Sequence, residues 1–328
     1  MEIEGESIDE IIRSSLCILK TQGKENTPTK GKNLELTGVL LTLSDPLNRV
    51  SRAESKNTLY SCLGELTWYL SGSEDAEHMI YYLSRYRNYA ELDGTVGGAY
   101  GPRLIGQSDS VNQIENIISI LEHKPSSRQA VIQIFDKHDL VNKKKDIPCT
   151  QTLQFILREN CLELIATMRS NDVFRGLPHD IFCFTMLQEL VASELSSRLN
   201  RKIKLGSYKH FVGSFHVYDE DSGLIGRYNQ EGYPNPTPIM TPMPENSYAD
   251  VRNFIEVEKE IRKGELGESI SAELPPYWGD LTIMLKSFKI YKSNPLDGCR
   301  KLQSQIENLS NSNYKPIIQK LIDKIRKK

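Results

Sequence analysis

The chain has 328 residues, of which 38% are hydrophobic, so it can bury a sizeable core as one large domain or two smaller ones. Lys and Arg number 41 and Asp and Glu 43, and this near balance gives no overall field to attract nucleic acid or a membrane surface. No run approaches the roughly 20 apolar residues of a membrane span, and the N-terminus lacks the basic-then-apolar pattern of a secretion signal. We therefore expect a cytoplasmic protein in which a few local cations hold any anionic ligand.

Six cysteines are scattered along the chain without a C-x-x-C pair. In a cytoplasmic protein of this size most of them are expected to be small buried hydrophobic residues. No two lie close enough in sequence to begin a zinc site, so we expect no metal. Cys149 differs from the others because proline precedes it and polar residues follow it.

The predicted elements of the first half begin after a polar, loose lead-in at residues 1–32. Residues 33–43, NLELTGVLLTL, are typical of a strand, and a turn with Pro and Asn follows. Apolar residues at helical spacing predict a helix over 59–72 that stops at its final glycine. Aromatic residues and glycines crowd together in 81–100, a composition that suits a loop-rich lining of a pocket.

The second half predicts a sheet and a long helix. Residues 127–135, SRQAVIQIF, are apolar on both faces, so we expect a strand inside a sheet. Residues 152–160 and 161–170 read as two strands of a hairpin, because the polar REN lies between them. After Pro178 the sequence predicts a helix of about five turns with one apolar stripe facing the core, and a further strand follows in 209–221.

Three parts of the chain are expected. The polar lead-in, 1–32, precedes a catalytic core over 33–232, and a Pro-rich segment with helical extension over 233–328 packs on the same domain. The five prolines of 233–244 exclude a helix or a central strand there. The basic amphipathic C-terminal segment is interpreted as a solvated helix face in preference to a membrane-binding one.

Taken singly, the polar residues of the central region have ordinary explanations. Cys149 is compatible with an inert thiol, and Arg169 with a structural ion pair. Asp180 is compatible with a helix N-cap whose carboxylate accepts from first-turn N–H groups, and His216 with a satisfied polar residue.

Their order and spacing carry more information than any one residue. The segments IPCT, MRSNDVFRGLPHDI and GSFHVY, with GELTWYL, GAYG and PSSRQ upstream, together resemble the thymidylate synthase family over residues 33–221. The resemblance implies an α/β (α+β) fold with a mixed twisted sheet packed with helices, here with extra C-terminal helices. It also implies a homodimer that binds a pyrimidine nucleoside monophosphate and a reduced folate, with no nucleic acid and no membrane as partner.

The resemblance assigns the chemistry of C5 alkylation. C5 of a pyrimidine reacts only after a nucleophile adds to C6, and a thiolate both adds and leaves well. Cys149 is the implied nucleophile, and the guanidinium of Arg169 favours its thiolate and contacts the phosphate. Glu65 is implied to organise water and proton transfer, and Tyr100 to help remove the C5 proton.

Further residues are assigned to the two ligands. The resemblance implies that Ser170 adds a hydroxyl to the phosphate site. It also implies that His216 and Tyr218, which share one face of a strand, bond the sugar 3′-hydroxyl. Asp172 and Gly176 match positions that contact folate, which is expected as 5,10-methylenetetrahydrofolate. Tyr86 and Tyr89 in YRNYA take the place of the family's Trp-rich stretch on the folate.

The phosphate site departs from the family pattern. The family donates two adjacent arginines across the dimer interface, whereas this chain has Arg128 followed by Gln129. One planar guanidinium is therefore missing. Either Lys30 or Lys32 compensates, or the phosphate is bound more weakly.

Asp180 selects among members of the family, because thymidylate synthases have asparagine there. A carboxylate accepts from the 4-amino group of cytosine and from a protonated N3, but it opposes O4 of uracil. Such a mismatch costs about 1–3 kcal/mol, or roughly 10–100-fold in discrimination. Aspartate here, with Thr150 where synthases usually have histidine, resembles the cytidylate 5-hydroxymethylases, acting on CMP or dCMP. The alternatives are a divergent thymidylate synthase that methylates dUMP and a non-catalytic nucleotide-binding protein.

Overall fold

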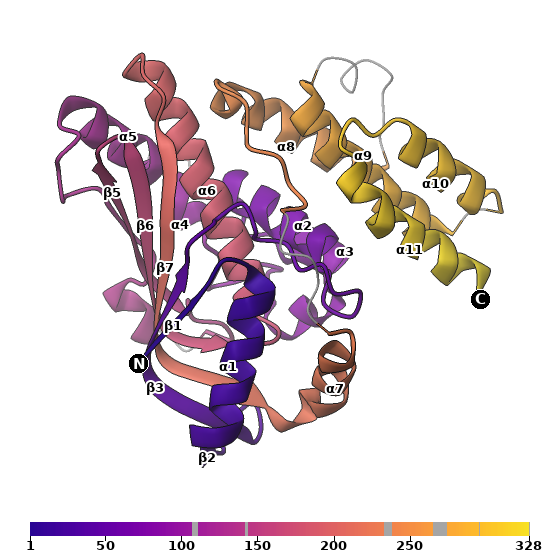
Figure 1. Cartoon of the computed structure of the whole chain (residues 1–328), viewed down its shortest axis with the longest axis horizontal. Coiled ribbons are helices and arrows are strands. Elements are labelled where there is room, and N and C mark those ends of the chain that lie inside the picture. The colour runs from indigo at the N-terminus through magenta and orange to yellow at the C-terminus, as the bar shows by residue number, and fades with distance from the viewer. Residues whose placement is uncertain (107–110, 142–143, 233–237, 265–273, 295, 328) are drawn as a thin grey trace. The chain divides into compact units, whose positions relative to one another are not determined.

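The computed structural model describes residues 1–106, 111–141, 144–232, 238–264, 274–294 and 296–327 (Figure 1). The chain divides into two compact units, Met1–Pro238 and Ile239–Lys328. Within the described part, no helix combines the length and the apolar character that crossing a bilayer requires.

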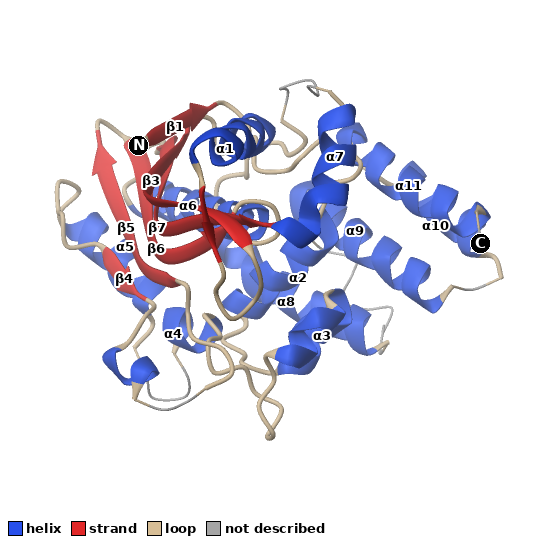
Figure 2. Cartoon of the chain, turned by 90° about the horizontal axis from the view of Figure 1, so that it is seen from below, coloured by secondary structure: helices blue, strands red, loops and turns tan. Residues whose placement is uncertain are grey.

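The first unit is built on a mixed sheet, which Figure 2 shows as one group of strands with helices beside it. The described strands follow the order β1-β3-β7-β6-β5-β4, and β2 pairs with β3. Their bounds are β1 Glu2–Gly5, β2 Lys24–Asn26, β3 Asn33–Leu43, β4 Val131–Gln133, β5 Thr150–Arg158, β6 Cys161–Asp172 and β7 Lys204–Tyr218. The β1–β3 and β6–β7 pairs are parallel and the others antiparallel, so the predicted mixed α/β architecture is confirmed.

The helices and short 3-10 turns of the first unit connect and cover these strands. Their bounds are α1 Ile8–Gln22, α2 Leu59–Leu70, α3 Ala76–Tyr82, η1 Ser84–Asn88, α4 Gly101–Ile105, α5 Gln113–His123, η2 Lys137–Leu140, α6 Leu177–Arg198, η3 Asp219–Asp221 and α7 Ser222–Gln230. Helix α6 packs against β6, β7 and α2. Helix α6 thus contacts both the sheet and α2, and its first turn lines the pocket described below.

The predicted hairpin of β5 and β6 is confirmed. The strands pair antiparallel up to Arg158 and Cys161. Glu159 and Asn160 form the turn with φ of 49° and 61°, the left-handed pair that a two-residue hairpin turn requires. The strand over 33–43 and the helix that begins at Leu59 also lie where the sequence predicts them.

The expected buried strand at 127–135 is wrong. Only Val131–Gln133 is a strand, and it lies at the edge of the sheet with Val131 and Gln133 exposed. A hydrophobic run does not distinguish an edge strand from a central one, because the neighbour on the far side decides.

The long helix is more buried than its predicted stripe. It begins at Leu177, with Pro178 in the first turn where a missing N–H costs nothing. Every residue from Leu177 to Ser193 is buried. The expectation of a single core-facing stripe is therefore wrong, because α2, α5 and the sheet all pack against this helix.

The loose lead-in expected at 1–32 is also wrong for most of its length. Strand β1 pairs with β3, and α1 buries an apolar face that includes Ile8, Ile11 and Leu19. Asp9 of this helix accepts from Ser51 Oγ at 2.6 Å and from the Tyr228 hydroxyl at 2.7 Å. The helix was not predicted because the many charged residues of the segment make the helical spacing of its apolar residues hard to recognise.

The second unit is helical within its described residues. Its elements are α8 Ser247–Lys263, α9 Pro276–Ser293, α10 Gly298–Glu307, η4 Ser312–Tyr314 and α11 Lys315–Arg326. Helix α9 packs against α8, α10 and α11. The predicted helical extension is thus present, while its packing on the core stays a prediction. Residues 233–237 of the Pro-rich segment lie outside the described residues.

Candidate active site

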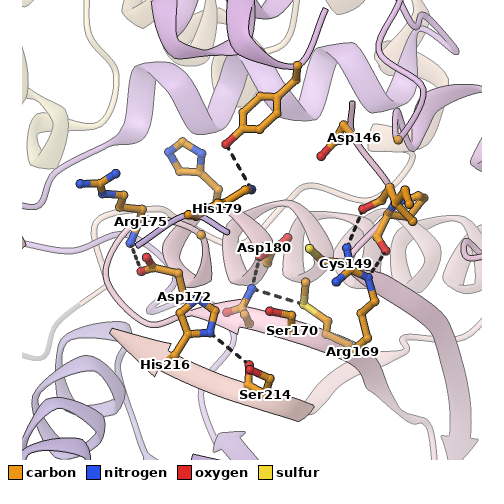
Figure 3. Close-up of a pocket in the computed structure, with 18 of the residues that line it drawn as sticks. Asp146, Cys149, Arg169, Ser170, Asp172, Arg175, His179, Asp180, Ser214 and His216 are labelled. Atoms are coloured by element: carbon orange, nitrogen blue, oxygen red, sulfur yellow. Dashed lines mark hydrogen bonds between the residues drawn. The ribbon is translucent and has the colours of Figure 1, made fainter. Parts of the chain in front are cut away.

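A cavity of about 470 Å³ opens among α2, η1, β6, β7 and the start of α6, all in the first unit. This volume falls in the range of roughly 300–1,000 Å³ that small-molecule sites occupy. Figure 3 shows polar side chains that line it, among them Cys149, Asp180 and His216. The sequence-predicted residues that line it are Glu65, Tyr86, Tyr100, Cys149, Arg169, Ser170, Asp172, Gly176, Asp180, His216 and Tyr218.

Cys149 lies at the end of the loop that leads into β5, and Arg169 holds that loop. The Arg169 guanidinium donates to the carbonyl oxygens of Pro148 and Ile147, each at 2.9 Å. Burial raises the pKa of the Cys149 thiol, and the positive charge of Arg169 opposes this shift. The free site therefore holds a thiol beside a group that favours its ionisation.

Tyr100 is bound to the residue after the cysteine. Its hydroxyl oxygen accepts from the Thr150 backbone N–H at 3.1 Å and from the Thr150 hydroxyl at 3.0 Å. Both lone pairs of the phenol are then used, so its own proton is the group that it can offer to a ligand. Burial raises the pKa of Tyr100 well above its ordinary value.

Asp180 lies in the first turn of α6, whose N-cap is Gly176, so Asp180 itself is not the N-cap. Its Oδ2 accepts from the Asn171 side-chain amide at 2.6 Å. Burial, together with the charge of Glu65, raises the pKa of Asp180 to about 7, against the opposing effects of Asn171 and His179. This carboxyl can therefore gain or lose a proton near neutral pH.

Glu65 projects from α2 and is surrounded by donors. Its Oε1 accepts from the hydroxyls of Tyr69 and Tyr86 at 3.0 and 3.1 Å, and its Oε2 lies 2.8 Å from His179 Nδ1. Burial alone would raise the pKa of Glu65, but the hydrogen bonds and charge of its partners bring the pKa below its ordinary value. Glu65 is thus held as a carboxylate, and Tyr86, predicted at the folate, is one of its partners.

Asp172 closes β6 and organises the turn before α6. Its Oδ1 accepts from the backbone N–H groups of Phe174 and Arg175 at 2.6 and 2.7 Å. Its Oδ2 is buried without a protein partner, and burial raises the pKa of this carboxyl. Arg175 binds Asp221 at 2.8 Å. Asp172 therefore fixes the turn through Oδ1, while its Oδ2 is buried beside the cavity that the residue lines.

His216 and Tyr218 lie on β7 with their rings in edge contact, 4.9 Å between centroids. His216 Nδ1 lies 3.3 Å from the Ser214 carbonyl oxygen (Figure 3). The other ring nitrogen of His216 is thus available to the cavity, where the family resemblance implies a sugar hydroxyl.

Arg128 is not brought to this cavity. It is exposed in the segment before β4 and is absent from the residues that line the pocket of its own chain. Lys30 lines the cavity and lies 4.8 Å above the Tyr89 ring, whereas Lys32 pairs with Glu25 at 3.0 Å. Of the two lysines expected to compensate for the missing arginine, Lys30 is the better placed.

Several residues of the cavity were not predicted. His179, Asn171, Tyr69 and Asp146 all line it. His179 and Asn171 stand inside the segment MRSNDVFRGLPHDI, but their partners could not be deduced from it. His179 pairs with Glu65 across 114 residues, and only the packing of α6 on α2 brings them together.

Comparison with known proteins matches residues 43–259, more than half of the chain, to the thymidylate synthase family. Thymidylate synthase of Bacillus licheniformis is 30% identical over 168 residues, 49% of this chain and 55% of that protein. Deoxyuridylate hydroxymethyltransferase of Bacillus phage SP01 is 29% identical over 222 residues, 63% of this chain and 56% of that protein.

A further relative, thymidylate synthase of Buchnera aphidicola subsp. Baizongia pistaciae, is 25% identical over 216 residues, 63% of this chain and 79% of that protein. The chain spans about half the length of the first two relatives. The resemblance expected from the sequence is confirmed, and the chain belongs to the thymidylate synthase family.

Proposed function

We propose that the chain is a folate-dependent cytidylate 5-hydroxymethylase that acts on CMP or dCMP, with 5,10-methylenetetrahydrofolate as co-substrate. The observation that supports this most is the buried carboxyl of Asp180, fixed by Asn171 in the same cavity as Cys149. The phage relative whose name is a hydroxymethyltransferase supports the reaction class, although its name specifies a uracil nucleotide.

In the first step the Cys149 thiolate adds to C6 of the base. The protonated Asp180 donates to N3 of cytosine, and its other oxygen accepts from the 4-amino group. Addition at C6 makes the ring an amidine-like system with a more basic N3, which takes the Asp180 proton. The adduct is then neutral, and the Asp180 carboxylate accepts from its N3–H and from its 4-amino group.

In the second step C5 attacks the methylene carbon of the folate. The C5 proton then passes through ordered water to the leaving folate nitrogen, and tetrahydrofolate departs to leave an exocyclic methylene. Water then adds to that methylene carbon, one water proton passes to Glu65, and the electron pair of the exocyclic double bond re-forms C5=C6. The S–C6 bond breaks and the Cys149 thiolate leaves. The Tyr100 hydroxyl, whose lone pairs are occupied by Thr150, serves as a donor that orders water near C5.

Incubation with CMP, dCMP and dUMP, each with methylenetetrahydrofolate, tests this proposal. We expect a product heavier by one CH₂O unit from a cytosine nucleotide, seen by mass spectrometry, and release of tetrahydrofolate. Cys149→Ala should abolish it. Product from dUMP alone, with oxidation to dihydrofolate, would show that the enzyme is not a hydroxymethylase of cytidylate.

The base preference gives a sharper test. We predict that Asp180→Asn shifts kcat/KM from cytosine toward uracil nucleotides by roughly 10–100-fold, because the amide serves N3–H and O4. Asp172→Asn, a second carboxyl-to-amide change in the cavity, should leave the base preference as it is. An unchanged preference in Asp180→Asn would mean that other residues read the base.

A divergent thymidylate synthase is the second candidate, and the pKa of Asp180 near 7 favours it. A protonated Asp180 can donate to O4 and accept from N3–H, as an amide does. In that case turnover of dUMP should fall as the pH rises through about 7 and Asp180 ionises.

A further inference from the structure

His179 and Glu65 form a buried pair at the wall of the cavity. The two side chains are 5% and 6% exposed, and His179 Nδ1 lies 2.8 Å from Glu65 Oε2. Helix α6 supplies the histidine and α2 the glutamate, and these helices pack directly on each other. The pair is therefore a fixed part of the fold.

The hydrogen bonds around the pair determine where its protons are. Ser61 has one hydroxyl proton, which it donates to the Thr58 carbonyl at 3.0 Å. Its oxygen can then only accept from His179 Nε2, 3.1 Å away, so Nε2 carries a proton. On the other side Glu65 Oε1 already accepts from two phenols. One proton remains to be placed, between Nδ1 and Glu65 Oε2.

The two phenols favour the arrangement in which that proton is on the histidine, because they stabilise a carboxylate. Other titratable groups face the pair from both helices and from η1. These are Cys62 and Tyr69 on α2, Tyr86 on η1, and Asp180 and Cys183 on α6. Burial opposes a charge on His179, but Cys62 and Glu65 outweigh it and raise its pKa to about 10.

Asp180 shows how a buried carboxyl at this place behaves when it has no direct hydrogen bond to the histidine. It lies in the same helix turn as His179 and has an amide as its donor, at 2.6 Å. Burial raises its pKa to about 7, and the negative charge of Glu65 contributes. The charge of His179 lowers the pKa of both carboxyls, but only Glu65 also bonds to the ring, so Glu65 is ionised while Asp180 can hold a proton.

We propose that His179 is a positioning residue that holds Glu65 as a carboxylate, so that Glu65 can accept a proton from the water that attacks the methylene intermediate. This rests on the proposed hydroxymethylase function, in which Glu65 is the base. Without His179, burial would drive Glu65 toward the neutral acid, which cannot take that proton.

The first test observes the ring directly and needs no substrate. The chain has six histidines, so ¹⁵N-imidazole spectra of the whole protein and of His179→Gln assign the His179 signals by difference. We expect both ring nitrogens to be protonated from about pH 6 to about pH 9, far above the ordinary histidine pKa of about 6.5. Glu65→Gln should bring the titration down by at least about two pH units. A ring that is singly protonated at neutral pH would overturn the proposal.

The second test is kinetic and uses two variants of one position. His179→Gln keeps a donor without a charge, and His179→Phe removes both. Relative to the parent, we expect kcat of His179→Phe to fall about tenfold or more near pH 6.5 and to recover toward pH 9, with KM changing less than about threefold and His179→Gln intermediate. A loss that is equal at every pH would indicate a structural role only.

Asp180 titrates in the same range, so the comparison is repeated in Asp180→Asn. If the pH dependence of the loss in kcat caused by His179→Phe disappears in the Asp180→Asn background, that dependence belongs to Asp180 and the proposal is contradicted. If the ¹⁵N spectra show the charged pair but no pyrimidine nucleotide is turned over, the proposed function is wrong and the ion pair remains.

Discussion

Asp180 and Glu65 are buried to a similar extent, 8% and 6% exposed, yet their carboxyls differ in protonation. The pKa of Asp180 rises to about 7 because burial dominates, whereas hydrogen bonds and the charge of His179 hold the pKa of Glu65 below its ordinary value. The partners of a buried carboxyl therefore decide its role more than its depth does. A reaction that needs both a proton donor and a proton acceptor can draw on this difference.

The raised pKa of Asp180 predicts a pH-dependent gain in stability for Asp180→Asn. The ordinary pKa is 3.8 and the folded one about 7, so between these values the folded protein binds a proton that the unfolded chain does not. The stability that protonated Asp180 contributes is present below the unfolded pKa and is lost as the pH rises through the folded pKa. Urea unfolding without nucleotide should show the variant more stable by about 1–3 kcal/mol above about pH 8.

The same measurement near pH 4 is the internal control, since Asp180 is then protonated in the folded parent and the difference should be small. A difference that is constant from about pH 4 to about pH 8 would mean that Asp180 does not titrate as its burial requires. The hydrogen bond from the Asn171 side-chain amide is kept in the variant, because an amide oxygen at position 180 still accepts from it.

Some residues of the cavity could be predicted from the sequence because they stand in recognisable motifs. Cys149, Asp180, Glu65 and His216 were predicted from motifs, and the structure gathers them around one cavity. The partners were beyond the sequence. The contact between His179 and Glu65 depends on how two helices face each other, which no local pattern specifies.

Helix α2 carries Glu65 and is held in place by a close contact at the preceding residue. A Cβ at Gly64 would lie 2.2 Å from the ring of Tyr82 on α3. We predict that Gly64→Ala lowers the free energy of unfolding by about 1–2 kcal/mol, since displacing a buried ring outweighs the gain in helix propensity of at most about 1 kcal/mol. Activity should fall as well, because the shift reaches Glu65.

Gly226 in α7 is the matched control, as a Cβ there would meet nothing within 4 Å. Gly226→Ala should leave stability unchanged or raise it by up to about 1 kcal/mol. Thermal unfolding of both variants checks the pair of predictions. If the two substitutions change stability equally, the Tyr82 ring on α3 can move aside at little cost in free energy.

Elements with a strong local pattern were predictable, and those defined by neighbours were not. Strand β3, helix α2 and the β5–β6 hairpin follow from periodicity and turn residues. Helix α1 was missed because charged residues alternate with its apolar stripe. Strand β4 was taken for a central strand because its run is apolar on both faces, and only its place at the sheet edge exposes it.

At the scale of the whole molecule, the position of Arg128 bears on assembly. The side chain is exposed before the edge strand β4 and does not line the cavity of its own chain. The Arg128 guanidinium expected at the phosphate is therefore not supplied to the cavity of its own chain, whose lining cations include Arg169 and Lys30. An exposed edge strand with an unused arginine beside it agrees with the predicted homodimer, in which each chain donates Arg128 to its partner.

A composite site predicts that two inactive variants restore each other. Arg128→Ala lacks the donated arginine and Cys149→Ala lacks the nucleophile, so each homodimer should be inactive or nearly so. In a mixed dimer one site carries both defects, but the other combines Cys149 of one chain with Arg128 of the other. If subunits exchange freely, half of the dimers are mixed, so about one quarter of the parent activity should return.

A mixture of Cys149→Ala with Asp180→Ala is the control, since both residues belong to one chain's cavity and each mixed dimer would keep no intact site. Activity of Arg128→Ala equal to that of the parent would show that the phosphate is held without a partner.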